Sequence, residues 1–193
     1  RTIPSDWEAV AFPLVAAILT DSCITIQHID GSGSQGDEAI VAVLQSVGAC
    51  IDWNKEKEEL VVYGGSHAQK NFPAKNGVAG RLSTEHLPDK TLRINCSGFP
   101  DAVPALSVAA CFIEGTTIIE DIGVCRKKET DRIEVMKSEL TKLGATVEEG
   151  PDYLVIHGHS PLTADGNPNP EFVLHGGVVE SYDDHRVAMS LAV

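Results

Sequence analysis

The stretch Asp131-Arg-Ile-Glu-Val-Met-Lys-Ser-Glu-Leu-Thr-Lys-Leu-Gly-Ala145 decides the fold, because a related stretch occurs near the start of the chain. Its counterpart is Gly36-Asp-Glu-Ala-Ile-Val-Ala-Val-Leu-Gln-Ser-Val-Gly-Ala49. Apolar residues of the later copy recur every three or four positions, which predicts one apolar helical face: Ile133, Met136, Leu140 and Leu143. Gly48 and Gly144 follow at the position where a left-handed residue commonly ends a helix. The two stretches therefore predict two related amphipathic helices within an internal repeat.

The repeat extends on both sides of these helices. An apolar, Ala-rich run that predicts a buried helix and a β-branched run that predicts a strand precede each copy, and two short predicted strands follow it. A further predicted strand, Thr91–Asn95, leads into the second copy, and a third copy begins at Asp184. We therefore expect an α/β fold of repeated βαβαββ units, in which helices pack against sheets through right-handed connections.

The expected organisation is a single lobe over residues 1–193. Its repeat units span about 1–64, 91–158 and 171–193, the last of them incomplete. Segment 64–90 is rich in Gly, Asn, Lys and Pro, which predicts an inserted surface loop. The chain starts with Arg1 and ends within an apolar run, so we expect a piece of a longer protein.

Composition excludes several classes of function. The chain has 15 Lys and Arg against 28 Asp and Glu, a net charge of −13, which argues against a general nucleic-acid binder or a polybasic membrane-surface protein. The longest apolar run, residues 9–19, is too short to span a bilayer. The 5 cysteines include no CxxC pair, and we expect reduced thiols in a cytoplasmic protein.

Three charged junctions before helices are the candidate functional segments: 99–102, 126–132 and 180–186. Segment 126–132 places several cations at a predicted helix start, capped by Thr130 or Asp131, and such a start favours anions. The alternative is a solvated helix start at 126–132, with Asp101 and a Ser or Asp of 180–186 as simple N-caps of their helices. The three segments occupy related positions in the repeat, which favours their convergence at one end of the domain, where we expect a locally basic rim.

Two weaker patterns carry less information. His157 and His159 lie on one face of a predicted strand, but no third ligand is nearby in sequence, and we expect no metal site. The Gly-rich stretch 31–36 lacks the Lys-Ser/Thr of a P-loop, so we interpret it as a turn.

Several motifs closely resemble the EPSP synthase (3-phosphoshikimate 1-carboxyvinyltransferase) family. They are Lys128-Glu-Thr-Asp-Arg132, Pro100-Asp-Ala102, Tyr182-Asp-Asp-His-Arg186 and Gln35-Gly-Asp37. The resemblance covers nearly the whole chain and implies most of the C-terminal lobe, an inside-out α/β barrel of three βαβαββ units in pseudo-threefold arrangement, with the third truncated. It implies transfer of the enolpyruvyl group of phosphoenolpyruvate to the 5-hydroxyl of shikimate 3-phosphate, with release of phosphate. It also implies no cofactor, a missing N-terminal lobe of the same chain, and a monomer.

The resemblance also implies roles for individual residues. Asp101 would orient or deprotonate the 5-hydroxyl, and Lys128 would contact the shikimate substrate and help proton transfer. Glu129 would move a proton to and from the methylene carbon of phosphoenolpyruvate. The expected substrate-binding residues are Arg126, Arg132, His185 and Arg186, with Arg132 and Arg186 on phosphoenolpyruvate.

The chain departs from the family pattern at three places. Val124 stands where the family often has Asn, Trp7 and Glu8 stand where small residues are common, and segment 64–90 is long. Two alternatives therefore stay open: a non-catalytic paralogue that binds anions, and enolpyruvyl transfer to a nucleotide sugar.

Overall fold

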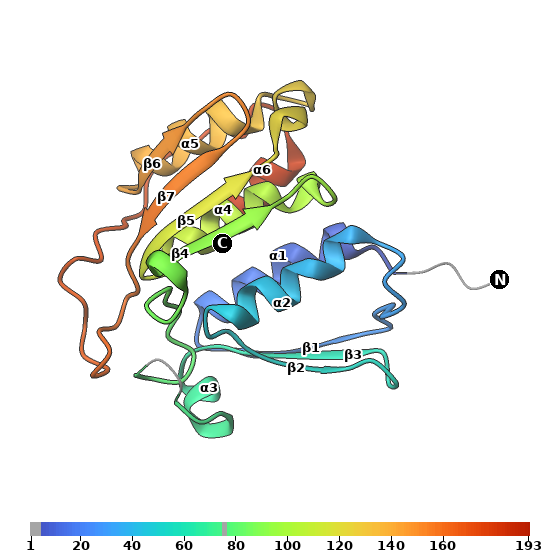
Figure 1. Cartoon of the computed structure of the whole chain (residues 1–193), viewed down its shortest axis with the longest axis vertical. Helices are drawn as coiled ribbons and strands as arrows, with labels where there is room; N and C mark the ends of the chain where they lie inside the picture. The colour runs from blue at the N-terminus through green and yellow to red at the C-terminus, as the bar shows by residue number, and fades with distance from the viewer. Residues whose placement is uncertain (1–4, 75–76) are drawn as a thin grey trace.

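The two copies of the repeat fold into the same order of elements (Figure 1). The computed structural model describes residues 5–74 and 77–193. The first copy comprises α1 (Trp7–Leu19), β1 (Cys23–Gln27), α2 (Ala39–Ser46), β2 (Cys50–Asn54) and β3 (Glu59–Tyr63). The second comprises β4 (Thr91–Asn95), α4 (Val103–Cys111), β5 (Gly115–Glu120), α5 (Arg132–Lys142), β6 (Thr146–Glu149) and β7 (Leu154–Gly158). Among the described residues, only the second copy has the leading strand.

The strands form two sheets with corresponding topology. The first has the order β1-β3-β2 and is antiparallel throughout. The second has the order β4-β5-β7-β6, with β4 parallel to β5 and the other pairs antiparallel. Gly48 (φ 108°) and Gly144 (φ 95°) lie just after α2 and α5, as predicted. Both adopt the left-handed backbone conformation that favours glycine. The predicted α/β class is confirmed.

Helix α4 lies at the centre of the molecule. All nine of its residues are buried, and it packs against α1 on one side and α6 (His185–Leu191) on the other. Most of the buried apolar residues form one cluster that runs through both copies, from Trp7 in α1 to Val187 in α6, and Cys50, Ala68 and Ala79 form a small second one. Because α1, α4 and α6 pack together, the segments that precede them can meet.

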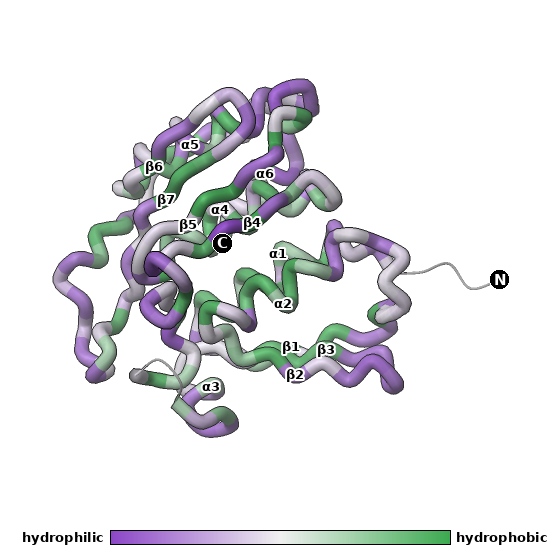
Figure 2. Tube along the Cα trace, in the orientation of Figure 1, coloured by the Kyte–Doolittle hydropathy of each residue, from purple (hydrophilic) through white to green (hydrophobic). Residues whose placement is uncertain are grey.

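Figure 2 shows hydrophobic residues along α1, α4 and the central strands, with hydrophilic residues at the turns. Within the described part of the chain, no helix combines the length and apolar character needed to cross a membrane.

The prediction of a surface loop over 64–90 was partly wrong. The segment contains helix α3 (Gly65–Asn71) and a short 3-10 helix (Pro88–Lys90), although residues 75–76 lie outside the described part. Its middle is buried at Leu82, Ser83 and Thr84. The amides of Ser83 and Thr84 donate to the carbonyls of Val47 (2.9 Å) and Glu114 (2.9 Å), one in each copy of the repeat. The segment joins the two copies, a role that its polar composition does not reveal.

The cysteines lead to a first prediction. Cys23 is exposed, and the other four cysteines, Cys50, Cys96, Cys111 and Cys125, are buried. Burial raises the pKa of the Cys96 and Cys111 thiols to about 12 and that of Cys125 to about 11. We expect a thiol reagent to label only Cys23 rapidly in the native chain, and all five after denaturation. Rapid native labelling of a second thiol, measured by mass spectrometry, would contradict the buried placement.

Candidate active site at three helix starts

Aspartates form the N-caps of three helices, α1, α5 and α6. Asp131 accepts from the amides of Ile133 and Glu134, both at 3.1 Å, and thereby caps α5. Asp184 caps α6, and Asp6 caps α1. Each cap satisfies amides that have no partner within the helix. Asp131, rather than Thr130, is therefore the cap of the charged segment 126–132.

Asp101 does not cap a helix. It lies in a short 3-10 helix (Pro100–Ala102), and α4 begins after it without a side-chain cap. The simple capping alternative for Asp101 was therefore wrong, and its carboxylate is available to the cations around it.

Arg132 joins the three junctions. Its side chain is fully buried, at 0% exposure, and its guanidinium donates to the carboxylates of Asp184 (Nε to Oδ2, 2.8 Å), Asp101 (Nη1 to Oδ1, 2.6 Å) and Glu129 (Nη2 to Oε2, 2.7 Å). The planar guanidinium suits this arrangement because its donors point in fixed directions. The alternative of a solvated helix start was wrong for Arg132, and the expected convergence of the three segments is confirmed.

Asp101 is the most heavily contacted carboxylate of the group. Besides Arg132, the Lys128 Nζ lies 3.2 Å from its Oδ1, and the Arg186 Nε lies 3.5 Å from the same atom. Burial by itself raises the pKa of Asp101, but the hydrogen bonds from Arg132 and Lys128 outweigh burial and hold the pKa below its usual value. Asp101 is consequently a carboxylate at neutral pH.

Asp184 behaves in the same way. Its side chain is fully buried, and burial alone would raise its pKa. The hydrogen bonds from Arg132 and from the amides of Arg186 and Val187 lower that pKa below its usual value. Asp184 thus remains charged in the interior, where it holds Arg132 in place.

Two acidic residues that sequence reasoning did not select also reach this site. Glu8, in the first turn of α1, forms an ion pair with the Arg186 Nη2. Asp37 is buried, its Oδ1 has no hydrogen-bond partner among the described residues, and burial together with Glu8 raises its pKa. Their signal in the sequence was weak: Glu8 was noticed only as a departure from the family, and Asp37 only as part of a motif.

Arg126 and His185 are placed differently from the other candidates. The Arg126 guanidinium donates to Asp131 (2.8 Å), Glu149 (3.0 Å) and the carbonyl of Gly150 (2.6 Å), which ties it to the β6–β7 turn. His185 begins α6 with an exposed side chain. Among the described residues, no hydrogen bond or ion pair links either side chain to Asp101.

The charge balance of the site differs from expectation. Lys128, Arg132 and Arg186 provide three positive charges, and their direct partners provide four negative ones: Glu8, Asp101, Glu129 and Asp184. The sum is −1, so the expected locally basic rim was wrong. Three of these acids, Glu8, Asp101 and Asp184, come from elements distant in sequence, which a count of charges along segment 121–132 does not include.

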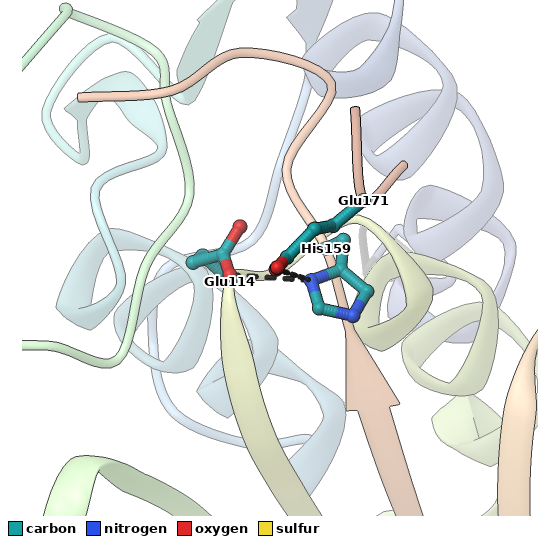
Figure 3. A group of neighbouring side chains, drawn as sticks. All are labelled: Glu114, His159 and Glu171. Atoms are coloured by element: carbon teal, nitrogen blue, oxygen red, sulfur yellow. Dashed lines mark hydrogen bonds and ion pairs between the residues drawn. The ribbon is translucent and has the colours of Figure 1, made fainter. Parts of the chain in front are cut away.

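A second cluster lies at the other end of β5 (Figure 3). The Nδ1 of His159 is 3.2 Å from a Glu114 oxygen and 3.6 Å from a Glu171 oxygen, a grouping close enough to hold a metal ion. The other Glu114 oxygen accepts from the Ser160 amide (3.0 Å) and lies 4.0 Å from the Arg81 guanidinium. These contacts already fasten the chain after β7 to the start of β5, and the neighbouring guanidinium opposes a cation.

The repeated order of elements and the buried ion-pair cluster define an α/β protein of related units, with a charged site where three segments meet. A solved EPSP synthase from Acinetobacter baumannii has the same fold, with a TM-score of 0.69 at 24% identity over 97% of this chain and 38% of that chain. Residues 1–193 match the family model described as EPSP synthase (3-phosphoshikimate 1-carboxyvinyltransferase). The chain belongs to this family.

Curated relatives carry the same description. The chain is 36% identical over 192 residues to the 3-phosphoshikimate 1-carboxyvinyltransferase of Ruminiclostridium cellulolyticum, covering 100% of this chain and 37% of that protein. It is 38% identical to the protein of that name from Synechococcus elongatus, covering 99% of this chain and 37% of the relative. The chain therefore spans just over a third of the length of these relatives.

Proposed function

We propose that the protein to which this chain belongs transfers the enolpyruvyl group of phosphoenolpyruvate to the 5-hydroxyl of shikimate 3-phosphate and releases phosphate. The observation that carries the proposal is the convergence of Asp101, Lys128, Glu129, Arg132 and Arg186 at one end of the fold. These residues belong to the motifs that resemble the family, and they come from three separate segments. A missing N-terminal lobe would complete the substrate pocket.

The substrates suit the cations of the site. Phosphoenolpyruvate carries a carboxylate and a phosphate, and shikimate 3-phosphate carries another of each, so fixed positive groups lower the cost of bringing them together. In this proposal Arg132 and Arg186 bind phosphoenolpyruvate, while Lys128 contacts the shikimate substrate. Because each of these cations already holds a carboxylate, substrate binding must rearrange some of these ion pairs.

Proton transfer is assigned to the acidic residues. The 5-hydroxyl oxygen forms a bond to the central carbon of phosphoenolpyruvate while the methylene carbon gains a proton, which gives a tetrahedral adduct. Loss of a proton from that carbon then accompanies cleavage of the bond to phosphate. Glu129, which is about half exposed, moves this proton in both steps. Asp101 has a lowered pKa and is a carboxylate in this state, so it orients the hydroxyl by accepting its hydrogen bond and takes up the hydroxyl proton as the new bond to carbon forms, with the Lys128 ammonium beside it.

The proposal extends to the setting of the protein. The route to aromatic amino acids would use this reaction, without a metal or organic cofactor, in a monomeric cytoplasmic enzyme. Arg126 and His185 would support the substrate pocket from its edge. These assignments rest on the family and on the motifs described above.

The decisive experiment measures phosphate release by the full-length protein with both substrates present. We expect release that requires phosphoenolpyruvate and shikimate 3-phosphate together. Binding of either substrate without release would favour the non-catalytic alternative, and release with a nucleotide sugar would favour the other. We also expect no turnover by residues 1–193 alone, since this chain supplies only one face of the pocket; turnover by this piece would contradict that expectation.

A further inference from the structure

Arg186 is already engaged by an anion of the chain itself. Its Nη2 pairs with the carboxylate of Glu8, which approaches from α1, whereas Arg186 lies in the first turn of α6. The two residues are 178 positions apart in the chain. Glu8 therefore occupies a donor that the proposed function assigns to phosphoenolpyruvate.

The first turn of α1 holds Glu8 in this position. Trp7 is 1% exposed, its indole Nε1 donates to the carbonyl of Asp30 (2.7 Å), and its amide donates to the Gln35 side chain (3.0 Å). The Glu8 amide donates to the cap residue Asp6 at 3.0 Å. A carboxylate in the first turn is also stabilised by the helix dipole. Neighbouring residues thus fix the backbone of Glu8, and the ion pair is a built feature of the fold.

The surroundings of Arg186 contain unsatisfied polar atoms. In the described part of the chain, the buried Nε of Arg186 has no hydrogen bond, although the Asp101 carboxylate lies 3.5 Å away, and the buried Oδ1 of Asp37 has no partner. Buried polar atoms are usually hydrogen-bonded, and exceptions often mark functional sites. Arg186 therefore retains an unused donor beside the donor that Glu8 occupies.

We propose that Glu8 is a specificity-determining residue that acts as an internal competitor for anions at Arg186. An incoming carboxylate or phosphate must displace Glu8 before it can use both edges of the guanidinium. A simple anion such as phosphate gains only its contact with the Arg186 guanidinium when it displaces Glu8. A ligand with two anionic groups can also contact Lys128, whose side chain is partly exposed, and it replaces the internal pair more readily. The identity of that ligand as phosphoenolpyruvate rests on the proposed function, but the competition itself does not.

The test compares Glu8→Gln with Glu38→Gln in the full-length protein. Both substitutions remove one negative charge from a glutamate in an ion pair, and the pair of Glu38 with Lys55 (2.7 Å) contains no residue of the site. Affinity for inorganic phosphate and for phosphoenolpyruvate is measured by calorimetry at low salt. We expect Glu8→Gln to bind phosphate about tenfold or more tightly than the unaltered protein, because a like charge has left the guanidinium. Glu38→Gln should match the unaltered protein.

Each outcome has a distinct meaning. Tighter phosphate binding by Glu8→Gln alone supports the competition, and unchanged or weaker binding overturns it. Tighter phosphate binding by Glu8→Gln, with no phosphoenolpyruvate binding by any variant, would support the competition by Glu8. The same result would contradict phosphoenolpyruvate as a substrate and therefore the proposed function. Glu8→Ser provides a second variant with the same expected direction, and circular dichroism checks that each variant is folded.

Discussion

Replacement of Arg132 by methionine is expected to lower the free energy of unfolding by about 3–5 kcal/mol. Arg132 is fully buried, and it donates to Asp184, which is itself fully buried, and to Asp101. Methionine fills much of the space but leaves both carboxylates without their main partner, and uncompensated buried charge is among the most destabilising changes known. Urea unfolding of the chain, followed by the fluorescence of Trp7 and Trp53, measures the loss.

Arg126→Met is the matched control for this change. Arg126 also pairs with two carboxylates, Asp131 and Glu149, but all three side chains are between a quarter and a third exposed. Partly exposed pairs are worth about 1 kcal/mol or less, so Arg126→Met should lose far less than Arg132→Met. Equal losses would contradict the special role of the buried guanidinium.

The pH dependence of the Arg132→Met loss provides a further check within the same experiment. The pKa values of Asp101 and Asp184 are lowered in the folded chain. Their ion pairs therefore contribute stability above the usual carboxyl pKa, and this contribution is lost as the pH falls through the lowered values. The stability difference between the unaltered chain and Arg132→Met should be full at pH 7 and should narrow in acid.

Replacement of Glu129 by glutamine in the full-length protein is expected to reduce turnover by about 10²–10⁴-fold. Glutamine preserves the shape of the side chain and can still accept a hydrogen bond from Arg132, but it cannot move a proton. The loss should appear in kcat, because substrate binding rests mainly on the cations. Lys128→Met should cause a loss of similar size by removing the cation beside Asp101.

Glu134→Gln is the control for the turnover experiment. Glu134 lies in the first turn of α5, soon after Glu129 in the chain, and is exposed, so Glu134→Gln removes the same charge outside the cluster. Its turnover should match that of the unaltered protein. A near-normal kcat in Glu129→Gln would remove Glu129 from the proposed proton transfer, whereas unfolding of the variant, monitored by circular dichroism, would show a structural role.

Local patterns in the sequence predicted much of the fold. The spacing of apolar residues in α5, the capping aspartates Asp131 and Asp184, and the closing glycines Gly48 and Gly144 all act within a few residues of the chain. The convergence of the three charged segments could also be predicted from the repeat, because equivalent positions of the repeat units occupy equivalent places in the fold. Interactions over one or two helical turns depend on sequence order, and they can be predicted from it.

The electrostatic character of the site required the tertiary structure. Sequence order suggested a basic rim, but packing buried Arg132 against carboxylates and placed Glu8 on Arg186. It also paired Arg126 with the β6–β7 turn, a contact that sequence order does not indicate. Glu139 shows the same limit: it is fully buried in α5, where it accepts from Lys142 and from the Glu180 amide of the chain before α6.

The sequence by itself therefore determined most of the elements of this protein, their order and the segments that meet, although not helix α3. Only the tertiary structure decided which charges neutralise one another. The physical reason is that a charge interacts with every other charge nearby in space, and burial strengthens those interactions by removing the screening water. The neighbours of Arg132 and Arg186 include residues 52 and 178 positions away, and their proximity exists only after the helices have packed.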